Sequence, residues 1–182
     1  MKNEQKFLIR RAVLEDAEQL AGVHIRSWEK AYCGLLPDSA IHAIGARRRQ
    51  QWDEFLCRSD FIHYVSERDG IITGFVGICP YRDEEHSPAG EIGGLYVAPE
   101  YWSCGIGTAL LHCGVQYLLQ SMRTPVYLWV LESNSRARAF YEKNLFRQDG
   151  AIKKVIIGTP QIELRYCYGK KATTVQAENK IS

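Results

Sequence analysis

The chain has 182 residues, of which 46% are hydrophobic, and a formal net charge of +2. A chain of this length can bury about two thirds of its unfolded surface in one core, so we expect a single domain over residues 1–169. The near balance of charge gives no reason to expect a nucleic-acid partner.

No apolar run reaches the roughly 18 residues that could span a bilayer, so no membrane association is expected. Residues 1–7 are polar and lack the apolar stretch of a secretory signal, which favours a cytoplasmic protein. The six cysteines are scattered without a Cys-x-x-Cys pair, and no histidines cluster near them. We therefore expect free thiols and no metal site.

In chain order, the first expected elements are a strand at 7–9 and a helix over 14–28 that carries His24 on its apolar stripe. A second helix is expected over 37–57, with a break near Gly45. Its basic run, Arg47 to Arg49, is interpreted as a solvated helix face.

Two β-rich runs follow, joined at Asp69-Gly70, a dipeptide that tolerates the positive φ angles of a type I′ hairpin turn. The remaining expected elements are strands at 91–97, 126–131, 148–157 and 161–168, helices at 105–119 and 135–144, and a disordered polar tail at 170–182. This order predicts an α+β, mixed-sheet architecture and not a regular βαβ winding.

The stretch YWSCGIGTALL, residues 101–111, places Gly105 and Gly107 at the start of a helix. The exposed N–H groups and positive dipole end of such a helix suit a phosphate, although the glycines could also serve the turn alone. The stretch is not a dinucleotide fingerprint, because Leu110 stands at the third glycine position. It is not a nucleoside-triphosphate loop either, because no Gly-Lys-Ser/Thr follows.

Gly93 and Gly94 interrupt the preceding strand, and glycines inside a strand indicate a bulge or a close backbone approach. A strand with unpaired amides, followed by an anion-binding helix start, could hold the amide-bearing arm and the pyrophosphate of coenzyme A.

The segment EIGGLYVAPEYWSCGIGTALL, followed after a strand by NSRARAFYEKNLF, resembles the acetyl-CoA-binding core of the GCN5-related N-acetyltransferase (GNAT) superfamily. The resemblance covers residues 7–168. The family's loop pattern, Arg or Gln, two residues, Gly, one residue, then Gly or Ala, falls on 102–107. The later Asn-x-x-Ala-x-x-Phe-Tyr pattern falls on 134–141. The resemblance implies a central mixed, mostly antiparallel, seven-stranded sheet flanked by about four helices.

The chain departs from the family pattern at two loop positions. Trp102 replaces the usual Arg or Gln, and Ser103 replaces a frequent glycine. A further departure is Asn144-Leu145 at a place where the family often has a glycine. Because backbone N–H groups do most of the work in such loops, we expect weaker but preserved pyrophosphate binding. The substitution Trp102→Arg is expected to tighten it.

The resemblance also implies roles for individual residues. The implied acetyl-CoA-binding positions are Leu95, Tyr96, Val97, Trp102, Ser103, Cys104, Gly105, Ile106, Gly107, Thr108, Asn134, Ala137 and Tyr141. Tyr141 would give a proton to the leaving thiolate, since its unperturbed pKa near 10 keeps it neutral at pH 7. Glu91 would act as base through water. The alternatives are an aromatic packing pair, Phe140-Tyr141, and an exposed carboxylate at a strand end.

The acceptor side is less defined by the sequence. Trp28 and Tyr32 are candidate wall residues, with the turn at Gly158 opposite, although both rings could serve to pack the first helix. The acidic residues 83–85 could attract a cationic amine or form a solvated loop. Cys104 is not expected to act as a nucleophile, because no histidine partner is near it in sequence.

The function expected is transfer of the acetyl group of acetyl-CoA to a primary amine of a small molecule or peptide, by direct attack in a ternary complex. A non-catalytic acyl-CoA-binding or sensor module on the same fold is the alternative. A homodimer is expected only through the resemblance.

Overall fold

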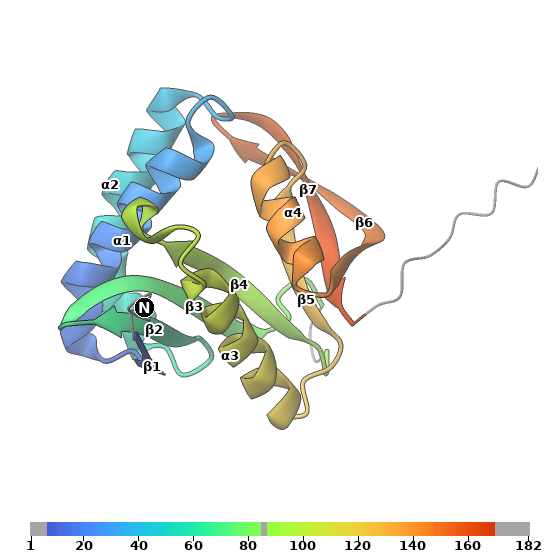
Figure 1. Ribbon diagram of the computed structural model, residues 1–182. Helices are drawn as coiled ribbons and strands as arrows, with labels where there is room; N and C mark the ends of the chain where they lie inside the picture. Colours follow the sequence, from blue (N-terminus) through green and yellow to red (C-terminus); the bar gives the residue numbers. More distant parts are fainter. Residues whose placement is uncertain (1–6, 85–86, 170–182) are drawn as a thin grey trace, which may run out of the picture.

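The computed structural model describes residues 7–84 and 87–169, so the tail expected at 170–182 lies outside the described residues. Its centre is a seven-stranded sheet in the order β1-β2-β3-β4-β5-β7-β6 (Figure 1). The strands are β1 Leu8–Arg11, β2 Ile62–Arg68, β3 Ile71–Pro80, β4 Gly90–Val97, β5 Val126–Leu131, β6 Phe146–Ile157 and β7 Thr159–Tyr168. Every neighbouring pair is antiparallel except β4 and β5, which confirms the predicted mixed sheet.

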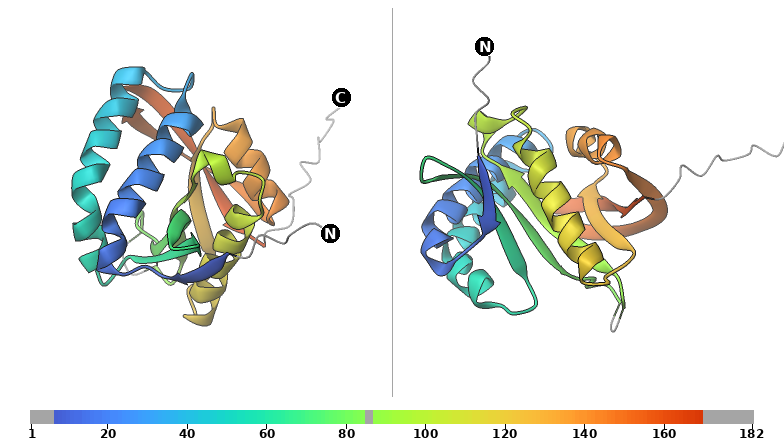
Figure 2. Two further views of the ribbon diagram at one scale, coloured as in Figure 1. Left: turned by 60° about the vertical axis from the view of Figure 1, so that its left-hand side comes forward. Right: turned by 60° about the horizontal axis from the view of Figure 1, so that its bottom comes forward.

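Four α-helices flank the sheet, as predicted. They are α1 Ala17–Tyr32, α2 Asp38–Cys57, α3 Ile106–Gln120 and α4 Ser135–Lys143, with short 3-10 turns at Leu14–Asp16 and Pro99–Tyr101. The helices α1 and α2 cover one face of the sheet and α3 covers the other (Figure 2). Neighbouring residues of a strand point to opposite faces, so Phe75 packs in the core under α1 and α2 while Val76 packs under α3.

The helix α2 is continuous, so the break predicted near Gly45 is wrong. A Cβ atom on Gly45 would lie 3.6 Å from Cγ2 of Ile25, which shows that the bare glycine lies against α1. Packing along the helix outweighs the roughly 1 kcal/mol by which a glycine disfavours a helix interior. The prediction of a solvated face also needs correction, because Arg47 and Arg49 are exposed but Arg48 is half-buried.

The hairpin between β2 and β3 turns at Asp69 and Gly70, whose φ angles of 52° and 76° confirm the predicted turn. None of the helices within residues 7–84 and 87–169 combines the length and apolar character needed to cross a membrane.

A bulge and a separation of strands shape the middle of the sheet. On β4, Gly94 pairs with Gly77 and Ile92 pairs with Ile78, so Gly93 is the extra residue of the predicted bulge. The parallel neighbours β4 and β5 pair only at Gly90 and Glu91 of β4. Beyond those two residues the strands diverge, which opens the sheet where the predicted site residues lie.

Candidate active site

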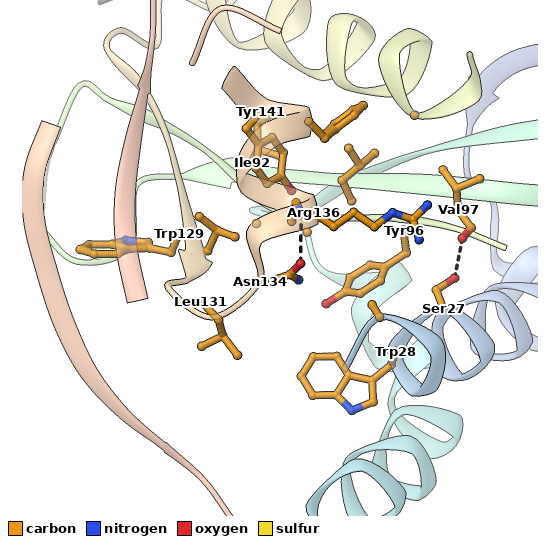
Figure 3. Close-up of a pocket in the computed structure, with 18 of the residues that line it drawn as sticks. Ser27, Trp28, Ile92, Tyr96, Val97, Trp129, Leu131, Asn134, Arg136 and Tyr141 are labelled. Carbon is orange, nitrogen blue, oxygen red and sulfur yellow. Dashed lines mark hydrogen bonds between the residues drawn. The ribbon is translucent and has the colours of Figure 1, made fainter. Parts of the chain in front are cut away.

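A cleft of about 1360 Å³ lies where β4 and β5 diverge. Its walls come from α1, α2, β4, the loop before α3, β5 and α4. Figure 3 shows Trp28, Tyr96, Asn134 and Tyr141 around this space. The structure brings together fourteen sequence-predicted residues along the cleft: Trp28, Tyr32, Glu91, Leu95, Tyr96, Val97, Trp102, Ser103, Gly105, Gly107, Thr108, Asn134, Ala137 and Tyr141.

Two sequence-predicted residues do not line the cleft with their side chains. Ile106, the first residue of α3, is buried in the core between this helix and the sheet and does not line the cleft. Cys104 is exposed and lies outside the cleft lining.

The backbone of β4 offers hydrogen-bonding groups to the cleft. The N–H of Ala98 donates to the carbonyl of Thr73 on the β3 side, and Tyr96 pairs with Phe75. Because strand residues alternate, the backbone groups of Leu95 and Val97 point away from β3. Within the described chain, β5 does not pair with β4 at this height. An extended, amide-bearing ligand could therefore add to β4 like another strand.

The carbonyl of Val97 already has a donor, because Trp102 Nε1 donates to it at 2.7 Å. Ser27 Oγ also lies 2.9 Å from it (Figure 3) and shares its single proton with the carbonyl of Val23 at 2.6 Å. The N–H of Val97 and both backbone groups of Leu95 are the groups that face the divergence between the strands.

The loop before α3 uses two left-handed residues. Ser103 has a φ of 63° and Gly105, the N-cap of α3, has a φ of 80°. A non-glycine residue in this region is strained, which accounts physically for the glycine that the family often has at the position of Ser103. A Cβ on Gly105 would meet nothing within 4 Å, so the turn conformation, and not crowding, requires glycine there.

The helix start presents N–H groups without partners inside the helix. The loop also lies close to α4, because a Cβ on Gly107 would be 3.4 Å from Cε2 of Phe140. The two motifs read from the sequence thus meet in space at the rim of the cleft.

Arg136 is a cleft residue that the sequence reasoning missed. Its guanidinium carbon lies 3.4 Å from the centre of the Trp102 ring, and no ion pair joins it to a carboxylate in the described part of the chain. Burial lowers the pKa of Arg136 from its usual range. The available signal was its place in the first turn of α4, two residues after Asn134.

Asn134 caps α4. Its Oδ1 accepts a hydrogen bond of 3.1 Å from the N–H of Ala137, and the residue is buried (Figure 3). The carboxamide oxygen is therefore engaged in the cap, and the same side chain also has a hydrogen bond with Tyr32. The two N–H donors of its NH₂ group are the part that a ligand carbonyl could share. Ala137 lines the cleft with a small side chain, as expected for a position beside a ligand.

Three tyrosines share the middle of the cleft. Burial raises the pKa of Tyr141 well above its usual value, and Tyr96 adds to this effect. Burial likewise raises the pKa of Tyr96 to about 12, with Arg48 opposing the rise. The pKa of Tyr32 is raised well above its usual value by burial first and then by Tyr96 and Tyr141. All three phenols are therefore protonated donors at neutral pH.

Glu91 is buried, with 2% of its surface exposed, so the alternative of an exposed strand-end carboxylate is wrong. Its Oε2 accepts hydrogen bonds from Arg82 Nε at 3.1 Å and from the Arg82 backbone N–H at 3.2 Å. Arg82 Nη2 also donates to Glu91 Oε1. The carboxylate lines the cleft as half of this ion pair.

On the acceptor side, Trp28 and Tyr32 both line the cleft, and their rings are in contact with centres 4.2 Å apart and planes tilted by 42°. Trp28 also packs with Leu36 and Ile41 in a small core, so this residue both packs the first helix and lines the cleft. The turn at Gly158 reaches the first turn of α2, because a Cβ there would lie 2.7 Å from that of Ala40.

The other polar groups singled out in the sequence lie away from the cleft. His24 is a buried core residue, and burial, followed by Arg48 and His63, lowers its pKa to about 3. In the acidic loop, Asp83 forms an ion pair with Lys153 at 3.3 Å, while residue 85 lies outside the described range. Within the described residues, no group of three or more His, Cys, Asp or Glu side chains could hold a metal ion.

A divergent pair of parallel strands beside a glycine-bearing helix start defines an acyltransferase-type fold, and the comparisons agree. The model of the acetyltransferase (GNAT) family matches residues 23–145, so the chain belongs to this family and is an N-acetyltransferase.

Relatives support this assignment, and a solved structure shares the fold. An uncharacterised N-acetyltransferase of Archaeoglobus fulgidus is 32% identical over 77% of this chain and 92% of its own length. The uncharacterised N-acetyltransferase YuaI of Bacillus subtilis is 29% identical over 69% of this chain and 72% of its own. The PaiA N-acetyltransferase of Thermoplasma acidophilum, solved in complex with coenzyme A, superposes with a TM-score of 0.74 and 24% identity, covering 90% of this chain and 99% of the other.

Proposed function

We propose that the chain transfers the acetyl group of acetyl-CoA to a primary amine by direct attack in a ternary complex. The observation that carries the proposal is one juxtaposition. The backbone groups of Leu95 and Val97 face the cleft beside the N-terminus of α3, and the protonated Tyr141 lines the same cleft.

The donor half of the cleft fits coenzyme A by its chemistry. Leu95 and the N–H of Val97 would bond the amides of the pantetheine arm, and the NH₂ group of Asn134 would bond one of its carbonyls. The N–H groups at the start of α3 would bind the pyrophosphate, with Arg136 supplying the positive charge that Trp102 lacks. Two solved neighbours, PaiA and a putative streptothricin acetyltransferase of Bacillus anthracis, hold coenzyme A and acetyl coenzyme A respectively.

The acceptor must attack as a neutral amine. At pH 7, deprotonating an amine of pKa about 10.4 costs roughly 4.6 kcal/mol. We propose that Glu91 takes this proton through a water molecule, while Arg82 fixes the carboxylate at the wall of the cleft. The amine nitrogen forms a bond to the acetyl carbon, and backbone N–H groups near Leu95 stabilise the oxyanion.

The bond that breaks is the one between the acetyl carbon and the thioester sulfur. Tyr141 donates a hydrogen bond to the departing sulfur and keeps its proton, because the pKa of the thiol, about 8.5, lies below that of the tyrosine. The products are the acetylated amine and free coenzyme A, whose sulfur takes up the proton that the amine released.

The test begins with calorimetric titration of acetyl-CoA into the purified protein, followed by a screen of primary amines for release of free coenzyme A. Micromolar binding with amine-dependent release supports the proposal. Binding without release for any amine would contradict the catalytic part, and no binding at millimolar acetyl-CoA would contradict the donor site.

A further inference from the structure

We infer that the acceptor amine carries a carboxylate and that Arg48 of α2 binds it. This inference rests on the proposed function and names the chemical class of its acceptor. It comes from an unpaired cation in the wall of the cleft.

Arg48 is held in a half-buried position in which none of its bonds neutralises its charge. Its Nε is fully buried and has no hydrogen-bond partner in the described chain. Its Nη1 donates to Gln51 Oε1 at 3.3 Å, and its guanidinium carbon lies 5.4 Å from the centre of the Phe55 ring. These three residues line the cleft from one face of α2, because they are spaced three and four residues apart.

No ion pair joins Arg48 to a carboxylate within the described residues. Burial lowers the pKa of Arg48, and the nearby cations Arg47 and Arg82 lower it further, while Tyr96 raises it. A desolvated guanidinium is costly unless an anion is bonded to it. An anionic ligand group would supply the missing partner.

The charges around the cleft favour the same class of ligand. The two carboxylates that line the cleft already have cationic partners, because Glu91 pairs with Arg82 and Glu163 lies 3.5 Å from Lys153. Arg47 and Arg48 are left uncompensated on the α2 wall. A cleft with this excess of positive charge attracts a carboxylate and repels a polycationic amine.

The position of Arg48 separates it from the expected phosphate site of the donor. The helix α2 covers the opposite face of the sheet from α3, whose N-terminus faces the donor loop (Figure 2). Arg48 shares the lining of the cleft with Tyr96 and with Arg82, the partner of Glu91, and it is close enough to both for their charges to affect its pKa. A ligand whose carboxylate lies at Arg48 could present its amine to the middle of the cleft. This site could not be predicted from the sequence, because Arg48 is one of three consecutive arginines.

The experiment measures kcat and KM for paired acceptors with the full chain at saturating acetyl-CoA. Each L-amino acid and a set of dipeptides are compared with their C-terminal carboxamides, and 1,4-diaminobutane is included as a dication. The variants are Arg48→Gln, Arg48→Lys, and Arg49→Gln as the control, since Arg49 is exposed on the same helix and does not line the cleft. Titration of acetyl-CoA checks that each variant is folded and binds the donor.

We expect the carboxylate member of the best pair to be favoured in kcat/KM by roughly 10- to 100-fold. In Arg48→Gln this preference disappears through a raised KM with kcat little changed, which marks a binding contact. Arg48→Lys keeps part of the preference because it keeps the charge but not the planar fork. Arg49→Gln keeps all of it.

Equal use of carboxylate and carboxamide, better use of the diamine, or a preference that survives in Arg48→Gln would overturn the inference. Preference for amino acids over dipeptides would identify a free amino acid as the source of the carboxylate, and the reverse would identify a peptide end. If acetyl-CoA binds but none of these amines is acetylated, both the proposed function and this inference fail. If amines are acetylated without a preference for the carboxylate member of a pair, only this inference fails and the proposed function stands.

Discussion

The guanidinium of Arg136 stacks on the indole of Trp102, 3.4 Å from its centre, and so places a cation from α4 beside the loop before α3. The loop itself has no basic side chain between 101 and 108. The charge that the family pattern puts in the loop is thus provided here by the first turn of another helix.

We predict that Arg136→Gln weakens acetyl-CoA binding about tenfold, which corresponds to about 1.4 kcal/mol. The reason is the loss of a charge-assisted contact to phosphate at the rim of the cleft. Calorimetric titration at two salt concentrations tests this, because the variant should also lose part of the salt dependence. Arg11→Gln, at an exposed position on β1, is the matched control. Unchanged affinity in Arg136→Gln would remove this residue from the donor site.

The expectation that Trp102→Arg tightens binding does not take account of two contacts that the structure shows. The indole N–H donates to the carbonyl of Val97 at 2.7 Å, and the ring supports Arg136. An arginine at 102 would lose both contacts and bring two guanidinium groups together. We therefore predict weaker acetyl-CoA binding in Trp102→Arg, with Trp102→Phe between this variant and the parent because it keeps a ring. Tighter binding in Trp102→Arg would show that the loop lacks a cation after all.

Tyr141→Phe should lower kcat roughly 100-fold, since a hydrogen bond to charge that develops in the transition state contributes on this scale. Affinity for acetyl-CoA should change little, because the ring remains. Burial raises the pKa of Tyr141, so in the parent its loss of a proton should limit turnover only above the usual range for tyrosine. Steady-state kinetics and donor titration measure the two effects, with Tyr117→Phe on α3 as control. Parental turnover would remove Tyr141 from the mechanism.

If Glu91 is the base, substitution of Glu91 or of its partner should lower kcat/KM. Glu91→Gln should lower the plateau of the pH–rate profile roughly 100-fold, which is the scale of general base catalysis. Arg82→Gln should lower it less, because the carboxylate remains but loses the cation that fixes it at the wall of the cleft. A Glu91→Gln variant with the parental profile and height would end the assignment, and the ion pair would then be structural.

Two buried histidines should make the protein less stable below neutral pH. Burial is the main cause that lowers the pKa of His24 to about 3 and that of His63 to about 4, against about 6.5 when unfolded. Between these values the unfolded chain binds more protons, so the free energy of unfolding is highest above pH 6.5 and falls as the pH drops toward 4.

The expected slope is up to about 1.4 kcal/mol per pH unit for each histidine. Urea unfolding from pH 7.5 to 5 measures it. In His24→Phe the slope should be roughly halved even if the variant is less stable at every pH. His112→Gln, exposed on α3, is the control and should keep the parental slope. A parental slope in His24→Phe would contradict the prediction.

Much of the fold could be predicted because its signals are local. Asp69-Gly70 marks a turn by its own backbone preference, and the glycines at 93 and 94 mark a bulge. The break expected at Gly45 failed because the gain from packing α1 against α2 is a tertiary effect, which helix propensity does not contain.

The donor half of the site was predictable from two motifs, whereas the two arginines that line the cleft, Arg136 and Arg48, were not. Arg136 and Arg48 reach the cleft from α4 and α2, and only the folded arrangement reveals that one stacks on Trp102 and the other has no carboxylate partner in the described chain. Nothing in a run of three consecutive arginines indicates which one becomes half-buried in the folded chain.

The contact of Gly158 with Ala40 has a consequence for how ligands enter and leave. The two sides of the cleft are joined at Gly90 and Glu91 through the sheet, and they meet again where the β6–β7 turn contacts the start of α2 (Figure 1). The walls of the cleft are therefore in contact at both of its ends, and the cleft is a bounded opening and not an open groove. We therefore predict that a small molecule or a free chain end is acetylated in preference to a lysine on the flat surface of a folded protein.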